Sequence, residues 1–297
     1  MSSIQFGDVS VTRVFEWQGH LITRENLVPE STRADWLDNS SWLVPEFWSP
    51  ESDDAWLCAA SFVLHSGGKT IVIDTAIGND KQRANVAPFS GLHTDFLDRL
   101  AAAGARPDDV DVVVNTHLHG DHVGWNTLRE GNQWIPTFPN ARYLLPQLDF
   151  DFWNPRGAQA PAGGTFFEDV FLDSVLPVVD AGLADFWEGS LVIDENLRLV
   201  SAPGHSPGAA VVELSSGGER AVFAGDLLHT PMQILRPAQS SSFDADPAEA
   251  AYSRARVLGQ VADSGAALIT SHFGVDRLPR LTRSGSAFRI DSWTDLT

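Results

Sequence analysis

The sequence predicts an α/β protein with the architecture of an αββα sandwich, in which two mixed β-sheets are flanked by helices. Short apolar runs that end at Gly, Pro or polar residues occur in both halves of the chain, and such runs are typical of buried strands. Helical patterns at residues 94–104 and 246–263 would lie outside the sheets. We expect residues 1–297 to form a single domain, because the candidate site residues span most of the chain.

The individual elements follow from local patterns. Residues 9–15 alternate between apolar and polar side chains, which indicates an early strand. Residues 61–73 contain two apolar runs around Ser66-Gly67-Gly68-Lys69, which predicts a hairpin. Thr94 is the expected N-cap of a helix that ends near Gly104, and Asp246-Pro247 is the expected start of a helix that ends before Gly265.

Composition limits the classes of function. The chain has 297 residues with 20 Lys and Arg against 39 Asp and Glu, a formal net charge of −19, and this charge would repel a phosphate backbone. We therefore expect a small-molecule substrate and no nucleic-acid partner. The sequence has no apparent secretory signal and no run long enough to cross a bilayer, so we expect a cytoplasmic protein without a membrane partner. The single cysteine, Cys58, lies among apolar residues and is expected to be buried and inert.

The most informative segment is residues 115–122, with the sequence NTHLHGDH, which directly follows the apolar run Val112-Val113-Val114. It holds three imidazoles and one carboxylate, donors that suit zinc and its first-row neighbours. Residues two apart in extended chain point the same way, so His117 and His119 can face one metal. Asp121 and His122 follow Gly120 at the expected start of a helix, displaced enough to serve a second metal.

Four other apolar runs also end on a possible ligand. Residues 70–73 lead to Asp74, 197–200 to His205, 221–225 to Asp226, and 267–271 to His272. If these runs are strands in packed sheets, their ends can share one rim, where loop residues form a site. Each of these residues alone is weak evidence for a metal site. It becomes a credible ligand only because the histidine cluster at residues 117–122 is also present.

Together these motifs resemble those of the metallo-β-lactamase-fold hydrolases. The His-x-His-x-Asp-His signature stands at residues 117–122, the Gly-His-Ser-Pro-Gly segment at 204–208 and the Gly-Asp turn at 225–226, over a match from about Ala55 to about Phe273. The resemblance implies a site for two divalent metal ions. The first would be held by His117, His119 and His205, the second by Asp121, His122 and His272, with Asp226 as a bridge.

The resemblance further implies that Asp74 orders the ligand loop without binding metal. We predict zinc, while manganese, iron and cobalt accept the same donors. The bridging Asp226 argues against β-lactam hydrolysis, since the antibiotic-degrading members lack it. The ligand pattern and the absence of a flavodoxin domain argue against the flavodiiron branch.

Within this fold, the chain resembles quorum-quenching N-acyl-homoserine lactonases and methyl parathion hydrolase-like enzymes. In several lactonases a Tyr stands three residues after the bridging Asp, where this chain has His229. His229 can assist the substrate carbonyl or the leaving group, or it can be a wall residue. Asp121 and His229 are the predicted catalytic residues.

We therefore predict a dinuclear hydrolase that cleaves a lactone or other carboxylic ester through a hydroxide bridging the metals. The alternatives are a phosphotriester hydrolase, a glyoxalase-II-like thioesterase, an iron-dependent sulfur dioxygenase, and a non-catalytic binding module on the same fold. Metal stoichiometry separates the dioxygenase, because a single iron would leave some ligands unused.

Two aromatic-rich segments, around residues 30–56 and 146–190, fit the expected sheets less well. Their aromatic side chains can form a substrate wall, a lid, a homodimer contact or a satellite core under long loops. The first three would favour a substrate with an apolar part or a dimer. Trp125, three residues after His122, can line the site or pack behind it.

Overall fold

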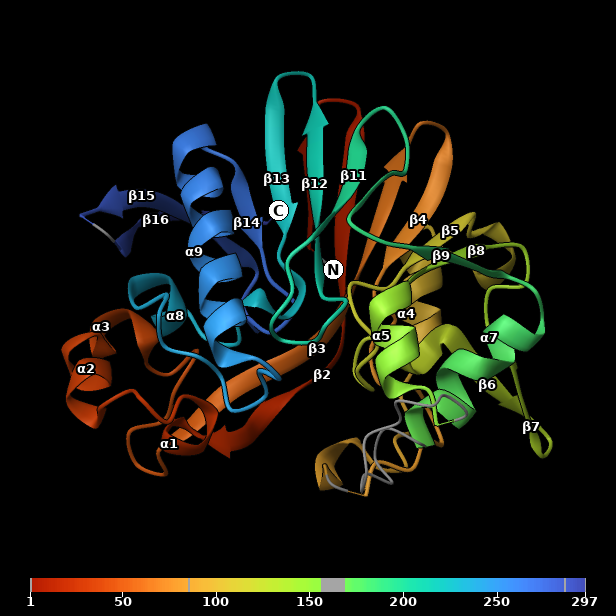
Figure 1. The fold of residues 1–297 in the computed structure, drawn as a ribbon, viewed down its shortest axis with the longest axis horizontal. Helices are drawn as coiled ribbons and strands as arrows, with labels where there is room; N and C mark the ends of the chain where they lie inside the picture. Colours follow the sequence, from red (N-terminus) through yellow and green to blue (C-terminus); the bar gives the residue numbers. More distant parts are fainter. Residues whose placement is uncertain (1, 85, 156–168, 286, 297) are drawn as a thin grey trace.

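The computed structural model describes residues 2–84, 86–155, 169–285 and 287–296. It contains two large mixed sheets, as the sequence predicted (Figure 1). The seven-stranded sheet has the order β1 (Ser2–Phe6), β2 (Val9–Thr23), β3 (Asp54–Ser66), β4 (Lys69–Ile73), β5 (Val112–Val114), β8 (Arg142–Pro146) and β9 (Ala184–Trp187). The five-stranded sheet has the order β10 (Ser190–Val192), β11 (Leu197–Ser201), β12 (Ala210–Ser216), β13 (Glu219–Phe223) and β14 (Ala267–Ile269).

Two short hairpins and a set of mostly short helices complete the described chain. The hairpins are β6 (Thr127–Glu130) with β7 (Gln133–Pro136), and β15 (Arg277–Ser284) with β16 (Ala287–Asp295). The helices are α1 (Arg24–Leu27), α2 (Arg33–Asp38), α3 (Ser40–Leu43), α4 (Phe96–Ala102), α5 (Gln147–Trp153), α7 (Leu176–Asp180), α8 (Met232–Leu235) and α9 (Pro247–Ser264). Single turns lie at Ala87–Phe89, Pro107–Asp109, Gly124–Asn126, Phe171–Val175 and Gly225–Leu227.

The strands of the two large sheets carry apolar side chains on both faces. Each sheet therefore buries one face against the other sheet and its second face under helices. In β3, Phe62 and Leu64 belong to the core between the sheets, while Val63 belongs to the core on the outer face. The ring of Phe62 meets that of Phe223 in β13 edge to face, with centroids 5.3 Å apart. Alternation with both faces covered is what a four-layer sandwich requires.

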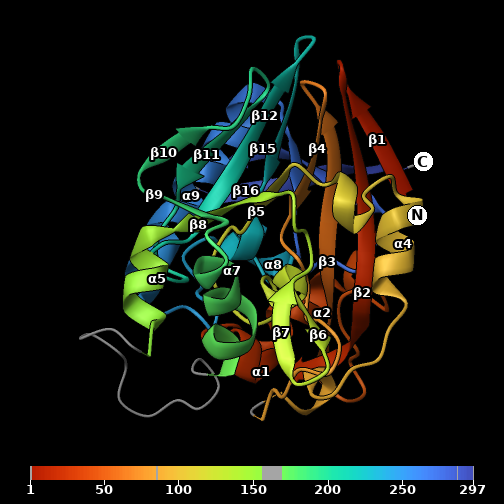
Figure 2. The same cartoon turned by 90° about the vertical axis from the view of Figure 1, so that its right-hand side faces the viewer.

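Helices cover the outer faces of both sheets. Phe96 and Leu100 of α4 join the core outside the seven-stranded sheet, and Val257, Leu258 and Val261 of α9 join the core outside the five-stranded sheet. Figures 1 and 2 show α9 and α4 on opposite sides of the molecule. The αββα prediction is therefore confirmed. The prediction that residues 1–297 form one domain stays a prediction.

The ends of several strands meet at one rim. The parallel pair β4 and β5 and the parallel pair β13 and β14 run into loops that carry Asp74, His117, Asp226 and His272. Gly225, just before Asp226, has a φ of +50°, and a Cβ there would lie 3.0 Å from Thr116 Oγ1. Glycine thus lets the loop after β13 approach the loop after β5.

Most local predictions are confirmed, with two exceptions. The hairpin of β3 and β4 and helix α9, capped by Asp246 and ended by left-handed Gly265, are present. Thr94, however, does not cap α4, which begins after Asp95, because its hydroxyl donates to Glu16 Oε1 at 3.0 Å. The predicted helix at Asp121 is also wrong, since that segment forms a turn before the single 3-10 turn at Gly124–Asn126.

The aromatic-rich segments serve different purposes. In the first, Trp36 and Trp48 are fully buried and pack edge to face, and they belong to the core outside the five-stranded sheet rather than to a satellite core. In the second, Phe171 is buried in the core on the outer face of the seven-stranded sheet, and Trp153 lies at the rim where the strands end. Phe166 and Phe167 lie outside the described residues. No helix in the described ranges is both long and apolar enough to cross a bilayer.

Replacing Phe62 by Ala should lower the free energy of unfolding by about 3–5 kcal/mol, because it opens a cavity between the sheets. Denaturant unfolding followed by circular dichroism measures this loss. As a control, Val192→Ala on β10, where the side chain is 68% exposed, should change stability by less than about 0.5 kcal/mol. Equal stability of Phe62→Ala and the wild type would contradict the buried position of this ring.

Candidate metal centre

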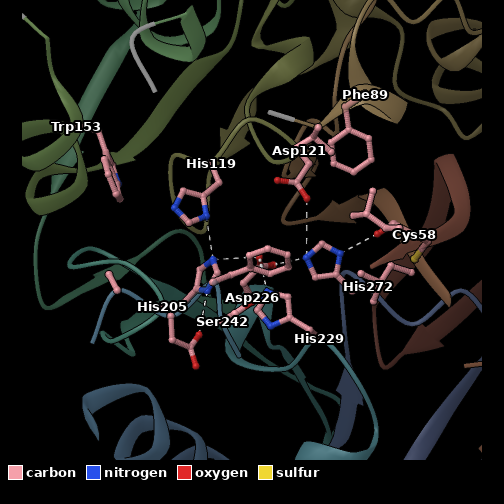
Figure 3. Close-up of a pocket in the computed structure, with 16 residues that line it drawn as sticks. Cys58, Phe89, His119, Asp121, Trp153, His205, Asp226, His229, Ser242 and His272 are labelled. Atoms are coloured by element: carbon pink, nitrogen blue, oxygen red, sulfur yellow. Dashed lines mark hydrogen bonds and ion pairs between the residues drawn. The ribbon is translucent and has the colours of Figure 1, made fainter. Parts of the chain in front are cut away.

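The seven ligand candidates lie together at the rim. Figure 3 shows those that line the pocket, His119, Asp121, His205, Asp226 and His272. The seven candidates form two clusters of donor atoms, each within 4.8 Å of one another. The clusters consist of His117, His119, His205 and Asp226, and of Asp121, His122 and His272. These are the sets that the sequence divided between two metals. The structure thus brings together every predicted ligand, from four separate stretches of chain.

Asp226 stands between the two clusters. Its Oδ1 lies 3.0 Å from His122 Nε2 and 2.9 Å from His272 Nε2, and its Oδ2 lies 3.2 Å from His205 Nε2. The Nε2 of His117 is 3.6 Å from Oδ2. One carboxylate therefore addresses both clusters, each with a different oxygen.

The far nitrogens of three imidazoles have partners of their own. His122 Nδ1 lies 2.8 Å from Asp74 Oδ2, His205 Nδ1 lies 3.1 Å from Asp244 Oδ1, and His272 Nδ1 lies 2.8 Å from the carbonyl of Cys58. An acceptor at Nδ1 fixes the proton there and leaves Nε2 with a lone pair directed at the centre. Asp74 also accepts from the backbone N–H and the hydroxyl of Thr116 at 2.8 Å, so it orders the ligand loop as predicted.

Asp149, in α5, is a site residue that the sequence did not reveal. Its buried carboxylate accepts from Leu118 N at 3.0 Å, Ser206 Oγ at 2.8 Å and Gly208 N at 2.5 Å. It therefore joins the loop of His117 and His119 to the loop of His205. A Cβ on Gly208 would lie 2.8 Å from Asp149 N, so this contact requires glycine. The only feature of the sequence that indicates a role for Asp149 is that this acidic residue lies within an aromatic-rich segment.

Glu16, in β2, was missed for the same reason. It accepts from the backbone N–H of Ile77 at 2.6 Å and from Trp125 Nε1 at 2.7 Å, and it is almost fully buried. This joins the loop after Asp74 to the turn after His122. Trp125 is thus packed behind the site, stacked on Phe96, and is absent from the described pocket lining.

The buried titratable groups of the site shift the pKa values of one another. Burial raises the pKa of a carboxyl, but the surrounding imidazoles, His122 and His272 foremost, hold the pKa of Asp226 well below its usual range. Burial lowers the pKa of His117 and His119, and neighbouring imidazoles lower it further. At His205, burial is outweighed by Asp226 and Asp244, which raise the pKa to about 9.

These residues fit a divalent metal. His117 Nε2 and His122 Nε2 are buried and make no hydrogen bond to the described residues, although both lie within 3.6 Å of Asp226. Buried polar atoms without a hydrogen bond are costly in a native fold, and a cation coordinated by their lone pairs removes that cost. Imidazole and carboxylate are the donors that first-row divalent ions accept.

A cavity of about 370 Å³ opens onto the clusters. Apolar side chains dominate its wall, and Trp153 and Phe89 face each other across it (Figure 3). His119, Asp121, His205, Asp226, His229 and His272 reach its surface, and its described lining contains no Lys or Arg. Cys58 also reaches the wall, where burial raises the pKa of its thiol to about 12, so it is inert as predicted.

His229 lies beside both clusters. Its Nε2 is 3.3 Å from Asp226 Oδ2, and its ring stacks on that of His272 with centroids 5.1 Å apart. Both ring nitrogens are buried and have no hydrogen-bond partner among the described residues. Burial lowers the pKa of His229 more than Asp226 raises it, so the imidazole is held neutral. A neutral ring carries one N–H that can be donated.

The fold and the clusters of metal-ligand residues define the class of protein, and the family follows from a match to residues 55–272. The chain belongs to the metallo-beta-lactamase superfamily. The fold prediction and the family resemblance are thereby confirmed.

Among curated proteins, the chain is similar to the N-acyl homoserine lactonase AttM of Azorhizobium caulinodans. The two are 30% identical over 115 residues, which cover 37% of this chain and 38% of AttM. It is also similar to ribonuclease TTHA0252 of Thermus thermophilus, with 27% identity over 192 residues, 59% of this chain and 36% of the ribonuclease. The chain thus spans less than half the length of either relative.

Among solved structures, AidC, a dizinc quorum-quenching lactonase in complex with a product, has the same fold. The TM-score is 0.78 over 99% of this chain and 97% of AidC, at 22% sequence identity. This likeness shows the fold of the whole chain.

Removing divalent metal should lower the midpoint of thermal unfolding. A ligand that binds only the folded state, at about 100 times its Kd, stabilises that state by about 2.7 kcal/mol. Calorimetry of metal-loaded and chelator-treated protein measures the difference. In His122→Ala the same treatment should produce a smaller shift, since a donor is gone. Identical midpoints for the wild type with and without chelator would contradict metal binding.

Proposed function

We propose that the protein is a dinuclear metal-dependent hydrolase of uncharged lactones or other carboxylic esters. The observation that carries the proposal is the meeting of two donor clusters at Asp226, on the floor of an apolar cavity. His117, His119 and His205 would hold one ion, and Asp121, His122 and His272 the other, with zinc as the proposed metal. Bound divalent ions supply Lewis acidity, which lowers the pKa of water and polarises a substrate oxygen.

The residues of the chain would bind and orient the substrate. The apolar wall, with Leu57, Phe89 and Trp153, offers a surface to an acyl or aryl group and excludes water from it. His229 would donate its N–H to an oxygen of the substrate or leaving group, because its ring nitrogens are buried, free of hydrogen bonds to described residues, and directed to the cavity. Asp121, at the cavity surface, would complete the second cluster.

The charge of the cavity wall and of the whole chain favours uncharged substrates over glutathione thioesters and nucleic acid. The described residues of the cavity wall include no Lys or Arg, so they offer no ion pair to the carboxylates of a glutathione thioester or to a phosphodiester chain. The net charge of −19 likewise opposes nucleic acid, in spite of the ribonuclease among the relatives. Phosphotriesters are uncharged and stay the second candidate. The lactonase similarity favours esters.

Two further predictions concern the whole protein. A cytoplasmic location is supported by the single cysteine, which is buried and forms no disulfide. A homodimer is supported by exposed apolar side chains such as Leu148, Leu172 and Phe186. Sedimentation of the purified chain tests the dimer.

Hydrolysis of a substrate panel tests the proposed function. The panel holds acyl-homoserine lactones, aryl esters, phosphotriesters and glutathione thioesters, with metal content measured on the same sample. We expect the highest kcat/KM on a lactone or ester with an apolar group, and two metal ions per chain. Turnover of glutathione thioesters alone, or one iron per chain, would contradict the proposal.

Asp226→Ala should reduce turnover on every active substrate by orders of magnitude while the far-ultraviolet circular dichroism stays unchanged, because both clusters lose their shared carboxylate. Asp263→Ala, which removes an exposed ion pair with Arg283, is the matched control and should keep full activity. Wild-type rates in Asp226→Ala would show that the carboxylate does not bridge.

His229→Ala should lower kcat less than Asp226→Ala, and mainly for esters with poor leaving groups. Loss of a proton donor costs about 10²-fold or more when the leaving group needs assistance, and little when it does not. A series of aryl and alkyl esters measures the dependence, with exposed His65→Ala as the control. An equal effect on all esters would favour a role in the wall of the cavity.

A further inference from the structure

Asp244 lies behind the ligand candidate His205, on the side away from the cluster. Its Oδ1 is 3.1 Å from His205 Nδ1, and its Oδ2 is 3.0 Å from Nη2 of Arg254 in α9. The side chains of Asp244 and Arg254 are both fully buried. A buried carboxylate between an imidazole and a guanidinium has few other arrangements available, so the three groups fix one another.

Arg254 fastens this group to the surrounding chain. Its Nε donates to the carbonyl of Leu227 at 2.8 Å, next to Asp226, and its Nη1 donates to the carbonyls of Pro237 and Gln239 at 2.9 and 3.1 Å. One guanidinium therefore joins α9, the turn after Asp226 and the segment that leads to Asp244.

The same segment forms part of the cavity wall. Ser242, Phe243 and Ala245 line the cavity, and Ser241 N donates to Asp244 Oδ2 at 3.0 Å. The backbone of Ala245 donates to the carbonyl of His205 at 3.1 Å. Side-chain and backbone bonds thus tie the wall at residues 241–245 to one ligand of the first cluster.

Asp74 is the counterpart in the second cluster. It holds His122 Nδ1 as Asp244 holds His205 Nδ1, but it comes from the loop after β4 and does not touch the cavity wall. Two carboxylates from distant parts of the chain therefore address one imidazole in each cluster, and only Asp244 also belongs to the substrate wall.

We propose that Asp244 is a positioning residue, which fixes His205 for the first metal and, with Arg254, couples that metal to the wall that carries Phe243. The inference rests on the proposed function, since it takes His205 as a ligand. The carboxylate accepts the proton of Nδ1 and keeps the lone pair of Nε2 on the cluster. Loss of such a partner typically weakens metal affinity by about 10–100-fold.

Chelator competition on the zinc-loaded protein tests this inference without a substrate. Asp244→Asn keeps the size and an acceptor oxygen but removes the charge, and it should weaken one of the two zinc equivalents by about 10-fold or more. The other equivalent should keep its wild-type affinity. Asp263→Asn, at an exposed ion pair between α9 and Arg283 of β15, is the matched control and should change neither.

A double-variant comparison separates positioning from structural support. In a His205→Ala background, Asp244→Asn should cause no further loss of zinc. It should still lower the melting temperature by the same amount as it does when His205 is present. An equal loss of zinc with and without the imidazole of His205 would overturn the proposal. So would unchanged affinity of both equivalents in Asp244→Asn.

The wild-type protein supplies a measurement that needs no folded variant at Asp244. In zinc-loaded protein with ¹⁵N-labelled histidine, the nitrogen-detected spectrum should show His205 with a proton on Nδ1 and none on Nε2. A proton on Nε2, or none on Nδ1, would overturn the proposal. A wild-type protein that binds no zinc would instead overturn the proposed function, so the two failures are distinguishable.

Discussion

The rest of the site depends on the approach of several buried imidazoles to a single carboxylate, Asp226. His122 and His272 approach one of its oxygens and His205 the other, at 2.9 to 3.2 Å. Such a concentration of polar groups is costly inside a protein unless each finds a partner of opposite charge or a metal. The fold must therefore hold loops from both sheets at one rim, against the tendency of these groups to remain in water.

The chain meets this demand with further buried carboxylates behind the ligands. Asp74, Asp149, Asp244 and Glu16 come from four distant segments, and each accepts hydrogen bonds from a loop of the site. Their acceptor oxygens also suit a site for cations. Part of the acidic composition is thus internal, where it supports the site.

The ligands were predictable because the information is local. His117, His119, Asp121 and His122 form one dense motif, and the apolar runs before Asp74, Asp226 and His272 identify strand ends. The metal-ligand residues at the end of a strand can therefore be recognised from the few residues around them.

The supporting carboxylates were not predictable, because their partners lie far away in sequence. Asp149 meets Ser206 and Gly208, and Glu16 meets Trp125, contacts that exist only once both sheets have packed. The error at Thr94 has the same cause: the local rule predicts a helix cap, but buried Glu16 offers its hydroxyl a stronger, charged acceptor. Local propensity thus gives way where a buried charge needs donors. Polar residues that break a local rule or interrupt an apolar run are therefore the ones to examine first for a role behind a metal site.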